Sequence, residues 1–228
     1  MRIKGLFMAL FFTVLCSVSA SAADFSDTGG HWAEYTIDRL SRLGVVDGVG
    51  GGRFNPDGTV TRAEFLKMIM SLEGVETVTP RAGECLDADK SNWYAPYLQG
   101  ALDKGLIPKE MIASYKVTMV TGDDGQTKAV YTGAFNGDLP IIREEMAVLT
   151  QNMYQYCIVY DTVGDMLKAA EISFVDKNEI SPWAVQCVRL TVAEGIMEGM
   201  DENYFEPKAT ATRAQAATIL GRVIDKTR

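Results

Sequence analysis

One pattern of residues occurs three times along the chain, and this repeat limits the possible folds more than any other feature. Each copy has a tryptophan five to seven residues after an aspartate, and a glycine twelve residues after the tryptophan. These residues are Asp27, Asp87, Asp176, Trp32, Trp93, Trp183, Gly44, Gly105 and Gly195. A phenylalanine and an arginine follow at identical offsets in the outer copies, but Phe135 and Arg143 of the middle copy come 20 residues later. The middle copy is therefore the same unit with a 20-residue insertion between Ile107 and Phe135.

Each copy is predicted to form a helix, a loop and a second helix. The first helix runs toward the glycine, which favours the left-handed conformation found at helix C-termini. The second helix starts at a capping box in the outer copies, Thr61–Glu64 and Thr212–Gln215, whereas Ile142 takes the capping position in the middle copy. Apolar residues then recur with helical spacing at Phe65, Met68, Leu72, Met146, Leu149, Met153, Ala216, Ile219 and Val223. The three units span residues 25–75, 85–156 and 174–224.

The insertion, residues 108–134, is predicted to form a β-hairpin. Its segments 115–121 and 126–131 partly alternate β-branched and aromatic residues, and Asp123-Asp124-Gly125 between them is typical of a turn. The outer units lack this segment, so we expect it to be dispensable for folding.

The repeated motifs resemble those of the S-layer homology (SLH) module. The first unit contains FSD, HWAEYTI, GVVDG and RFNPDGTVTRAEF, and the third contains FVD, SPWAV, GIMEG and YFEPKATATRAQ. The second unit, with CLDADKSNWYAPYL, KGLI and FNGDLPIIREEM, matches less closely. The resemblance implies a mainly α fold in which three helix-loop-helix repeats assemble into a pseudo-threefold spindle. Because one unit of about fifty residues buries too little apolar surface to fold alone, we expect a single domain over residues 23–228.

Residues 1–22 are predicted to be a secretory signal peptide. Arg2 and Lys4 precede an apolar run over residues 5–18, and Ala20-Ser21-Ala22 is a cleavage site of small residues. The run is shorter than the roughly twenty apolar residues that span a bilayer, so no membrane span is expected after cleavage.

Composition argues against several classes of function. With 22 Lys and Arg against 30 Asp and Glu, the net charge is −8, which is unfavourable for a nucleic-acid partner. His31 is the only histidine, which disfavours histidine-based metal sites and catalytic triads. No pair of acidic residues is marked for glycoside hydrolysis, so we expect no enzymatic activity, metal or cofactor. The cysteines of the mature chain can form at most one disulfide or be buried as small apolar residues: Cys85, Cys157 and Cys187.

The resemblance also implies a function. In SLH proteins the grooves between units hold a cell-wall polysaccharide, often one with a pyruvate ketal, and the module anchors exported proteins to the envelope. We therefore expect a secreted protein of the cell wall or S-layer surface that binds such an anionic polysaccharide, or a peptidoglycan-linked polymer, noncovalently. The alternative is a structural or protein-interaction component of an S-layer or wall assembly, which binds another envelope protein and no sugar.

Nine residues, three from each unit, are candidates for glycan binding. The arginine that starts the second helix can form two hydrogen bonds to a carboxylate, or it can pair with an aspartate of a neighbouring unit. The tryptophan can stack on a sugar face, or it can pack in the core, as is common at the start of an amphipathic helix. The candidates, which include the capping-box Glu or Gln, are Arg62, Arg143, Arg213, Trp32, Trp93, Trp183, Glu64, Glu145 and Gln215. The repeated aspartates are expected to cap a helix or to fix a turn.

Overall fold

The computed structural model describes residues 24–72, 74–80, 87, 92–157, 172–201 and 203–227. The predicted signal peptide, residues 1–22, lies outside this part of the chain, and so does Cys85. Cys187 carries a free thiol, and burial raises its pKa to about 11. Within the described residues, no helix is long and apolar enough to cross a membrane.

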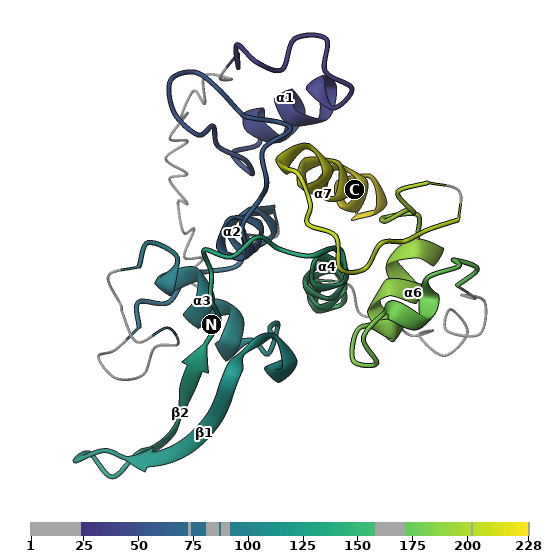
Figure 1. The fold of residues 1–228 in the computed structure, drawn as a ribbon. Coiled ribbons are helices and arrows are strands. Elements are labelled where there is room, and N and C mark those ends of the chain that lie inside the picture. Colours follow the sequence, from purple (N-terminus) through teal and green to yellow (C-terminus); the bar gives the residue numbers. More distant parts are fainter. Residues whose placement is uncertain are drawn as a thin grey trace, which may run out of the picture.

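The fold is mainly α, as predicted, and the described residues form three pairs of helices. The first helices of the units are α1 (Glu34–Arg42), α3 (Ala95–Asp103) and α6 (Val185–Ala193). The second helices are α2 (Arg62–Leu72), α4 (Arg143–Cys157) and α7 (Arg213–Thr227), and two short 3-10 helices are η1 (Lys109–Met111) and η2 (Lys177–Glu179). Figure 1 shows α2, α4 and α7 beside one another in the middle, with α1, α3 and α6 around them.

The glycines predicted to end the first helices do so. Gly44, Gly105 and Gly195 have backbone φ angles of 69°, 68° and 64°, a left-handed conformation that glycine adopts without strain. The residue after each glycine donates its backbone N–H to the carbonyl oxygen five residues earlier, at 2.9 Å in all three units. The chain therefore leaves each first helix through the same turn.

The predicted capping boxes are present at the second helices of the outer units. The Thr61 N–H donates to Glu64 Oε2 at 2.8 Å, and the Glu64 N–H donates to Thr61 Oγ1 at 3.2 Å. Thr212 and Gln215 form the same pair of bonds at 3.0 and 3.2 Å. The middle unit keeps half of the box, because Ile142 has no hydroxyl and its N–H donates to the glutamate three residues later at 3.4 Å. The start of α4 is therefore less well secured, as predicted.

The apolar stripes of the second helices form much of the core. All nine predicted positions are buried, namely Phe65, Met68, Leu72, Met146, Leu149, Met153, Ala216, Ile219 and Val223. The first helices add the buried residues Ile37, Leu98 and Val188. The loop between the two helices of each unit adds a phenylalanine that has no exposed surface: Phe54, Phe135 and Phe205.

The helices pack between units. Each first helix packs against the second helix of another unit: α1 against α7, α3 against α2, and α6 against α4. The second helix α2 contacts both α4 and α7. Separating the units would therefore expose the apolar stripes to water, which is unfavourable.

Three backbone hydrogen bonds join the units in a closed ring. The Val60 N–H donates to the Ala211 carbonyl at 3.0 Å, the Ala211 N–H to the Ile141 carbonyl at 3.2 Å, and the Ile141 N–H to the Val60 carbonyl at 3.1 Å. All three residues are buried. Each lies two positions before the arginine that starts a second helix, so the ring brings the three helix N-termini together.

The backbone N–H of each of these arginines also donates to the loop of the next unit. The pairs are Arg62 and Leu139, Arg143 and Ala209, and Arg213 and Gly58, at 2.9, 3.0 and 2.8 Å. The first N–H groups of a helix have no partner within the helix. A neighbouring unit therefore satisfies hydrogen-bond donors that each helix leaves unpaired.

The arginine side chains reach into the same loops, and we call each such contact a junction. Arg213 Nε donates to the Phe54 carbonyl at 2.8 Å, and its Nη2 donates to the Asp47 carbonyl at 2.7 Å. The equivalent acceptors are the carbonyls of Phe205 and Glu198 for Arg143, and those of Phe135 and Met111 for Arg62. Each guanidinium also lies 4.5 to 4.8 Å from the ring centroid of the same phenylalanine.

The repeated aspartate of each unit holds the turn that carries this phenylalanine, which confirms the second of its two expected roles. Asp27 accepts the backbone N–H groups of Phe54 and Asn55, both at 2.8 Å. The equivalent pairs are Phe135 and Asn136 for Asp87, and Phe205 and Glu206 for Asp176. The residue after each phenylalanine has a positive φ of 55° to 59°, so the carboxylate stabilises an uncommon backbone conformation. Although burial raises the pKa of Asp27, its bonds to Phe54 and Asn55 lower it below the usual value.

The insertion forms the predicted hairpin, which projects from the helices in Figure 1. Its antiparallel strands, β1 (Ala113–Thr121) and β2 (Thr127–Ala134), are slightly longer than predicted. The strand β1 is exposed along almost its whole length. Met111 and Ile112, which precede β1, are buried in the core, and Val130 of β2 is buried as well. The insertion therefore contributes to the core at these residues, contrary to the expectation that all of residues 108–134 are dispensable.

Removing one junction is predicted to destabilise the whole chain. Arg213→Met keeps an apolar stem but leaves the carbonyls of Phe54 and Asp47 without their donor. We expect the free energy of unfolding in urea to fall by about 2 to 3 kcal/mol. The control, Arg222→Met, removes a half-exposed arginine from the same helix and should cost less than about 1 kcal/mol. Equal losses in the two variants would contradict a structural role for the junction.

Shortening the hairpin is predicted to leave folding intact. Joining Lys116 to Thr132 through Asn-Gly removes most of both strands but keeps Met111 and Ile112. These two strand positions are paired across the hairpin, so a two-residue turn can connect them. We expect thermal unfolding to stay cooperative, with a melting temperature within a few degrees of the wild type. Loss of a cooperative transition would show that the strands are needed for the fold.

Candidate functional site

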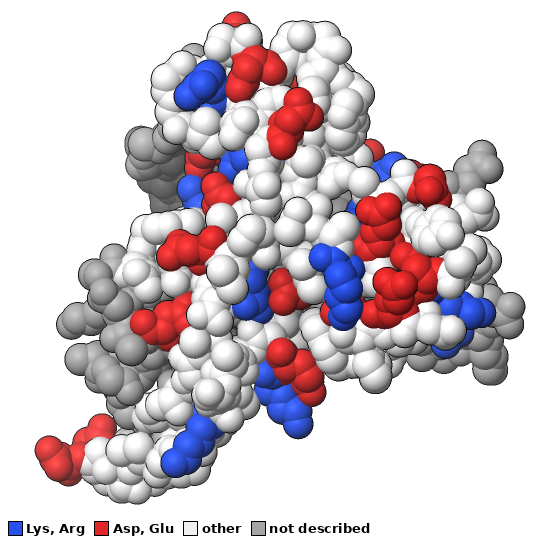
Figure 2. Space-filling model, in the orientation of Figure 1, with Lys and Arg blue, Asp and Glu red and all other residues white. Residues whose placement is uncertain are grey.

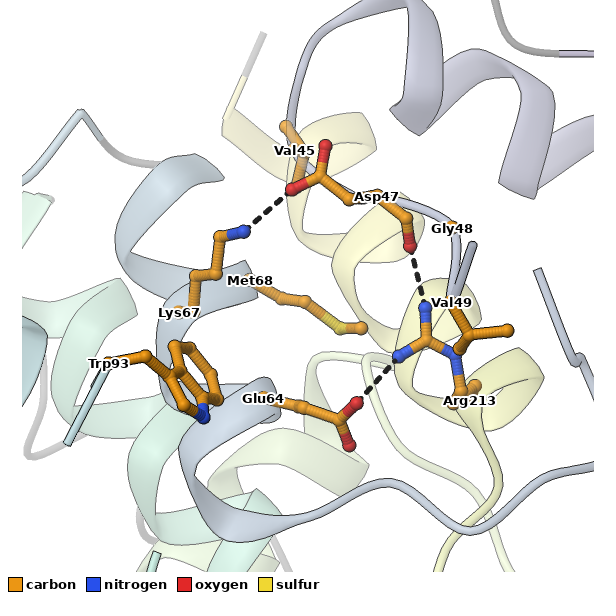
Figure 3. A pocket seen from close by; sticks show the side chains of 9 residues that line it. All are labelled: Val45, Asp47, Gly48, Val49, Glu64, Lys67, Met68, Trp93 and Arg213. Atoms are coloured by element: carbon orange, nitrogen blue, oxygen red, sulfur yellow. Dashed lines mark hydrogen bonds and ion pairs between the residues drawn. The ribbon is translucent and has the colours of Figure 1, made fainter. Parts of the chain in front are cut away.

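A cavity of about 300 Å³, the Trp93 groove, lies where the three units meet beside α2 (Figure 3). It is lined by Val45, Asp47, Gly48, Val49, Glu64, Lys67, Met68, Trp93 and Arg213. The first unit supplies the loop after α1 and one face of α2, the second supplies the tryptophan, and the third supplies the arginine. Lys67 Nζ lies 2.6 Å from Asp47 Oδ2, and Arg213 Nη1 lies 3.2 Å from Glu64 Oε1. These two ion pairs face one another across the groove in Figure 3.

A second cavity of about 230 Å³, the Trp32 groove, is built from equivalent positions beside α7. It is lined by Trp32, Arg143, Met197, Glu198, Gly199, Met200, Gln215, Thr218, Ile219 and Arg222. Here the third unit supplies the loop and the helix face, the first supplies the tryptophan, and the second supplies the arginine. Arg222 Nη2 lies 2.8 Å from Glu198 Oε2. Both grooves therefore need all three units.

The tryptophans are not equivalent in exposure. Trp32 is 65% exposed and Trp93 is 51% exposed, so packing in the core is the wrong interpretation for these two. Each is held by aromatic neighbours: His31 lies 5.2 Å from Trp32 and Tyr94 lies 5.6 Å from Trp93, between ring centroids. Trp183 is half-buried and packs against the core, as that interpretation predicts. Two of the three predicted stacking surfaces are therefore available to a ligand.

The candidate arginines are buried, and each forms hydrogen bonds to another unit. Arg62, Arg143 and Arg213 retain only 4% to 6% of their surface, and burial lowers the pKa of each guanidinium. Two nitrogen atoms of each guanidinium donate to carbonyls of the next unit, but Arg143 and Arg213 still contribute to groove walls. Arg143 and Arg213 therefore serve the fold and also border a cavity, whereas Arg62 lines neither groove.

The ionic partners of two of these arginines are the glutamates of the capping boxes. The expectation that an aspartate of a neighbouring unit is the partner is therefore wrong. Glu64 pairs with Arg213 at 3.2 Å, and Glu145 pairs with Arg62 at 3.4 Å. Burial raises the pKa of Glu145, and the neighbouring guanidinium opposes this shift. Gln215 occupies the same position at the third junction and carries no charge.

Several groove residues were not among the predicted candidates. Asp47 and Glu198 each precede the second glycine of the motifs GVVDG and GIMEG. A Cβ atom on that glycine would lie 2.6 Å from a backbone oxygen at Gly48 and 2.5 Å from one at Gly199, so the loop needs glycine there. The spacing of these glycines could have marked the acidic neighbours as groove residues. Lys67 and Arg222 fall at different offsets from the helix start, so the repeat does not mark them.

The described residues contain no cluster of three or more His, Cys, Asp or Glu side chains that could hold a metal ion. Acidic and basic side chains are interspersed on the face drawn in Figure 2, without an extended basic patch on that face. The groups that the grooves offer to a ligand are therefore exposed indoles, buried guanidinium groups and ion pairs.

Comparison with known proteins assigns the two outer units to a family. Residues 24–66 and 173–217 match the S-layer homology domain. The chain is 30% identical to an amylopullulanase of Thermoanaerobacterium thermosulfurigenes over 89% of its own length and 10% of that protein. It is 29% identical to the exoglucanase XynX of Acetivibrio thermocellus, over 92% of the chain and 17% of the relative. It is 23% identical to a surface-layer 125 kDa protein of Lysinibacillus sphaericus, over 95% of the chain and 16% of the relative.

The chain thus spans less than a fifth of these relatives. The middle unit lies outside both matched segments, in agreement with its weaker motifs. Its junction contacts, its aspartate-bound turn and its left-handed glycine nevertheless repeat those of the outer units. The chain belongs to the S-layer homology family, whose domain matches two of its three units.

Proposed function

We propose that this protein attaches noncovalently to the bacterial cell envelope by binding an anionic wall polysaccharide in the grooves between its repeats. The observation that carries the proposal is the pairing, in two grooves, of an exposed tryptophan from one unit with a buried arginine from another. Concave sites with an apolar surface and a few fixed polar groups are typical of ligand binding. Family membership, with a surface-layer protein among the relatives, supports attachment at the cell surface.

The two kinds of side chain would have separate tasks. The exposed indoles of Trp32 and Trp93 offer flat apolar faces on which a sugar ring can stack. Arg143 and Arg213 offer fixed N–H donors for sugar oxygens, which include those of a carboxylate such as a pyruvate ketal, and their orientation is set by the junctions. Binding then needs no movement of the site, which reduces its entropic cost. This arrangement serves recognition and leaves the bound sugar unchanged.

The proposal includes one domain, a pseudo-threefold spindle over residues 23–228. The cyclic order of helix contacts and the ring of three backbone hydrogen bonds support it. A groove that takes side chains from three units can exist only if the units stay together.

A second candidate function is suggested by the hairpin. Its strand β1 exposes Val117, Met119 and Val120 to solvent, and exposed apolar residues on an edge strand favour protein contacts. This observation supports the alternative of a wall or S-layer component that binds an envelope protein. The two functions use separate surfaces, so both can be tested on one chain.

The proposed function predicts binding to cell walls that depends on both tryptophans. The mature chain should cosediment with purified sacculi that retain their secondary polymer, and acid removal of the polymer should abolish binding. Trp32→Ala and Trp93→Ala should each weaken binding about tenfold, because each removes one stacking surface without disturbing the core. Cosedimentation at increasing protein concentration gives the affinity.

Tyr35→Ala is the matched control for these variants. Tyr35 is 78% exposed and lines neither groove, so its loss should not change binding. Equal binding to intact and stripped sacculi would exclude the polysaccharide as the ligand. Binding that only the hairpin-shortened chain loses would favour the second candidate function.

A further inference from the structure

The two grooves differ in the capping-box residue that lies beside the arginine of the junction. At two junctions a capping-box glutamate forms an ion pair with the arginine of the preceding unit: Glu64 with Arg213 and Glu145 with Arg62. At the third junction the arginine is Arg143 and the residue is Gln215, and both line the Trp32 groove. Gln215 keeps the capping role, since its Oε1 accepts the Thr212 N–H at 3.0 Å. It differs from a glutamate in offering no negative charge to the arginine.

The amide nitrogen of Gln215 is directed elsewhere. It donates to the sulfur of Met200 at 3.4 Å, on the loop wall of the same groove. Among the described residues, no carboxylate forms an ion pair with Arg143. Glu206 and Asp176 are the acidic groups that act on Arg143 at longer range, and neither lines the groove. Asp176 is occupied by two backbone N–H groups, and Glu206 is exposed, where solvent screens its charge.

The charges that line the two grooves do not balance in the same way. In the Trp93 groove, Arg213 and Lys67 are matched by Glu64 and Asp47, and both ion pairs are formed. The Trp32 groove contains two arginines, Arg143 and Arg222, but only one carboxylate, that of Glu198. Glu198 pairs with Arg222 at 2.8 Å.

The uncompensated charge belongs to Arg143, a side chain that is only 5% exposed. An arginine stays protonated even where burial lowers its pKa, so this site holds a permanent positive charge. Coulomb interactions are stronger near a partly buried charge than in open solvent. An anion that enters the Trp32 groove meets this charge, whereas one in the Trp93 groove must compete with Glu64.

We propose that Gln215 makes the Trp32 groove the charge-selective site of the domain, which takes the carboxylate of the wall glycan, while the Trp93 groove takes an uncharged sugar. The inference rests on the proposed function, because it assigns different parts of one ligand to the two grooves. A polymer with alternating acidic and neutral sugars would then be held in a defined orientation.

The reciprocal exchange of residues 64 and 215 tests this inference. The probe is the wall polysaccharide released from sacculi, used intact and after chemical reduction of its carboxylates to alcohols. Gln215→Glu should weaken binding to the intact polymer about tenfold and leave binding to the reduced polymer unchanged, because the new carboxylate pairs with Arg143. The capping box is retained, so the melting temperature should not fall.

Glu64→Gln is the matched variant in the other groove. It frees Arg213 from its carboxylate, so binding to the intact polymer should tighten severalfold. Unchanged binding in Gln215→Glu, or equal affinity of the wild type for intact and reduced polymer, would overturn this inference alone. If the wild type binds neither polymer, the proposed function fails as well.

Discussion

A buried arginine that donates to two backbone carbonyls of the next unit joins the three units of this protein in a closed ring. The contact recurs with Arg62, Arg143 and Arg213, and the backbone ring of Val60, Ile141 and Ala211 lies two residues before these arginines. A guanidinium is suited to this position because it carries several donors in a fixed planar fork. Each unit therefore depends on a neighbour both for buried apolar contacts and for partners of its helix N-terminus.

The same contact prepares the grooves. The loop carbonyls fix the orientation of Arg143 and Arg213, and each of these arginines lines a cavity that also contains a tryptophan from a different unit. The same residue therefore has a structural role and lies in the wall of the proposed binding site. Replacing such a residue disturbs fold and ligand together, so the exposed tryptophans and the capping-box residue report on binding more cleanly.

Much of the fold could be predicted from the sequence because local signals agree with the repeat. The glycine at each first-helix end, the capping boxes and the buried stripes all lie where the spacing places them. The hairpin was predicted from alternation and its Asp-Gly turn, although β1 begins two residues earlier than expected. In these segments local preference and tertiary packing favour the same conformation.

The site was harder to predict, because a repeat reveals which positions are equivalent but not which units meet. Glu64 and Arg213 are far apart in sequence, so their pairing follows only from the cyclic packing of helices. The exposure of Trp32 and Trp93 also depends on a neighbouring unit, while Trp183 at the equivalent position is half-buried. The departure of Gln215 from the repeat was visible in the sequence. Only the structure shows that it leaves Arg143 without a carboxylate partner in the Trp32 groove.

The inter-unit grooves are the proposed binding site of the wall polysaccharide, and the tryptophans allow a direct test. The chain has three tryptophans, so its indole N–H groups give three signals in a proton–nitrogen NMR spectrum of the mature protein. Titration with the released polysaccharide should shift the signals of Trp32 and Trp93, while that of Trp183 should change little. A titration in which the polymer binds but leaves both groove indoles unperturbed would contradict the account.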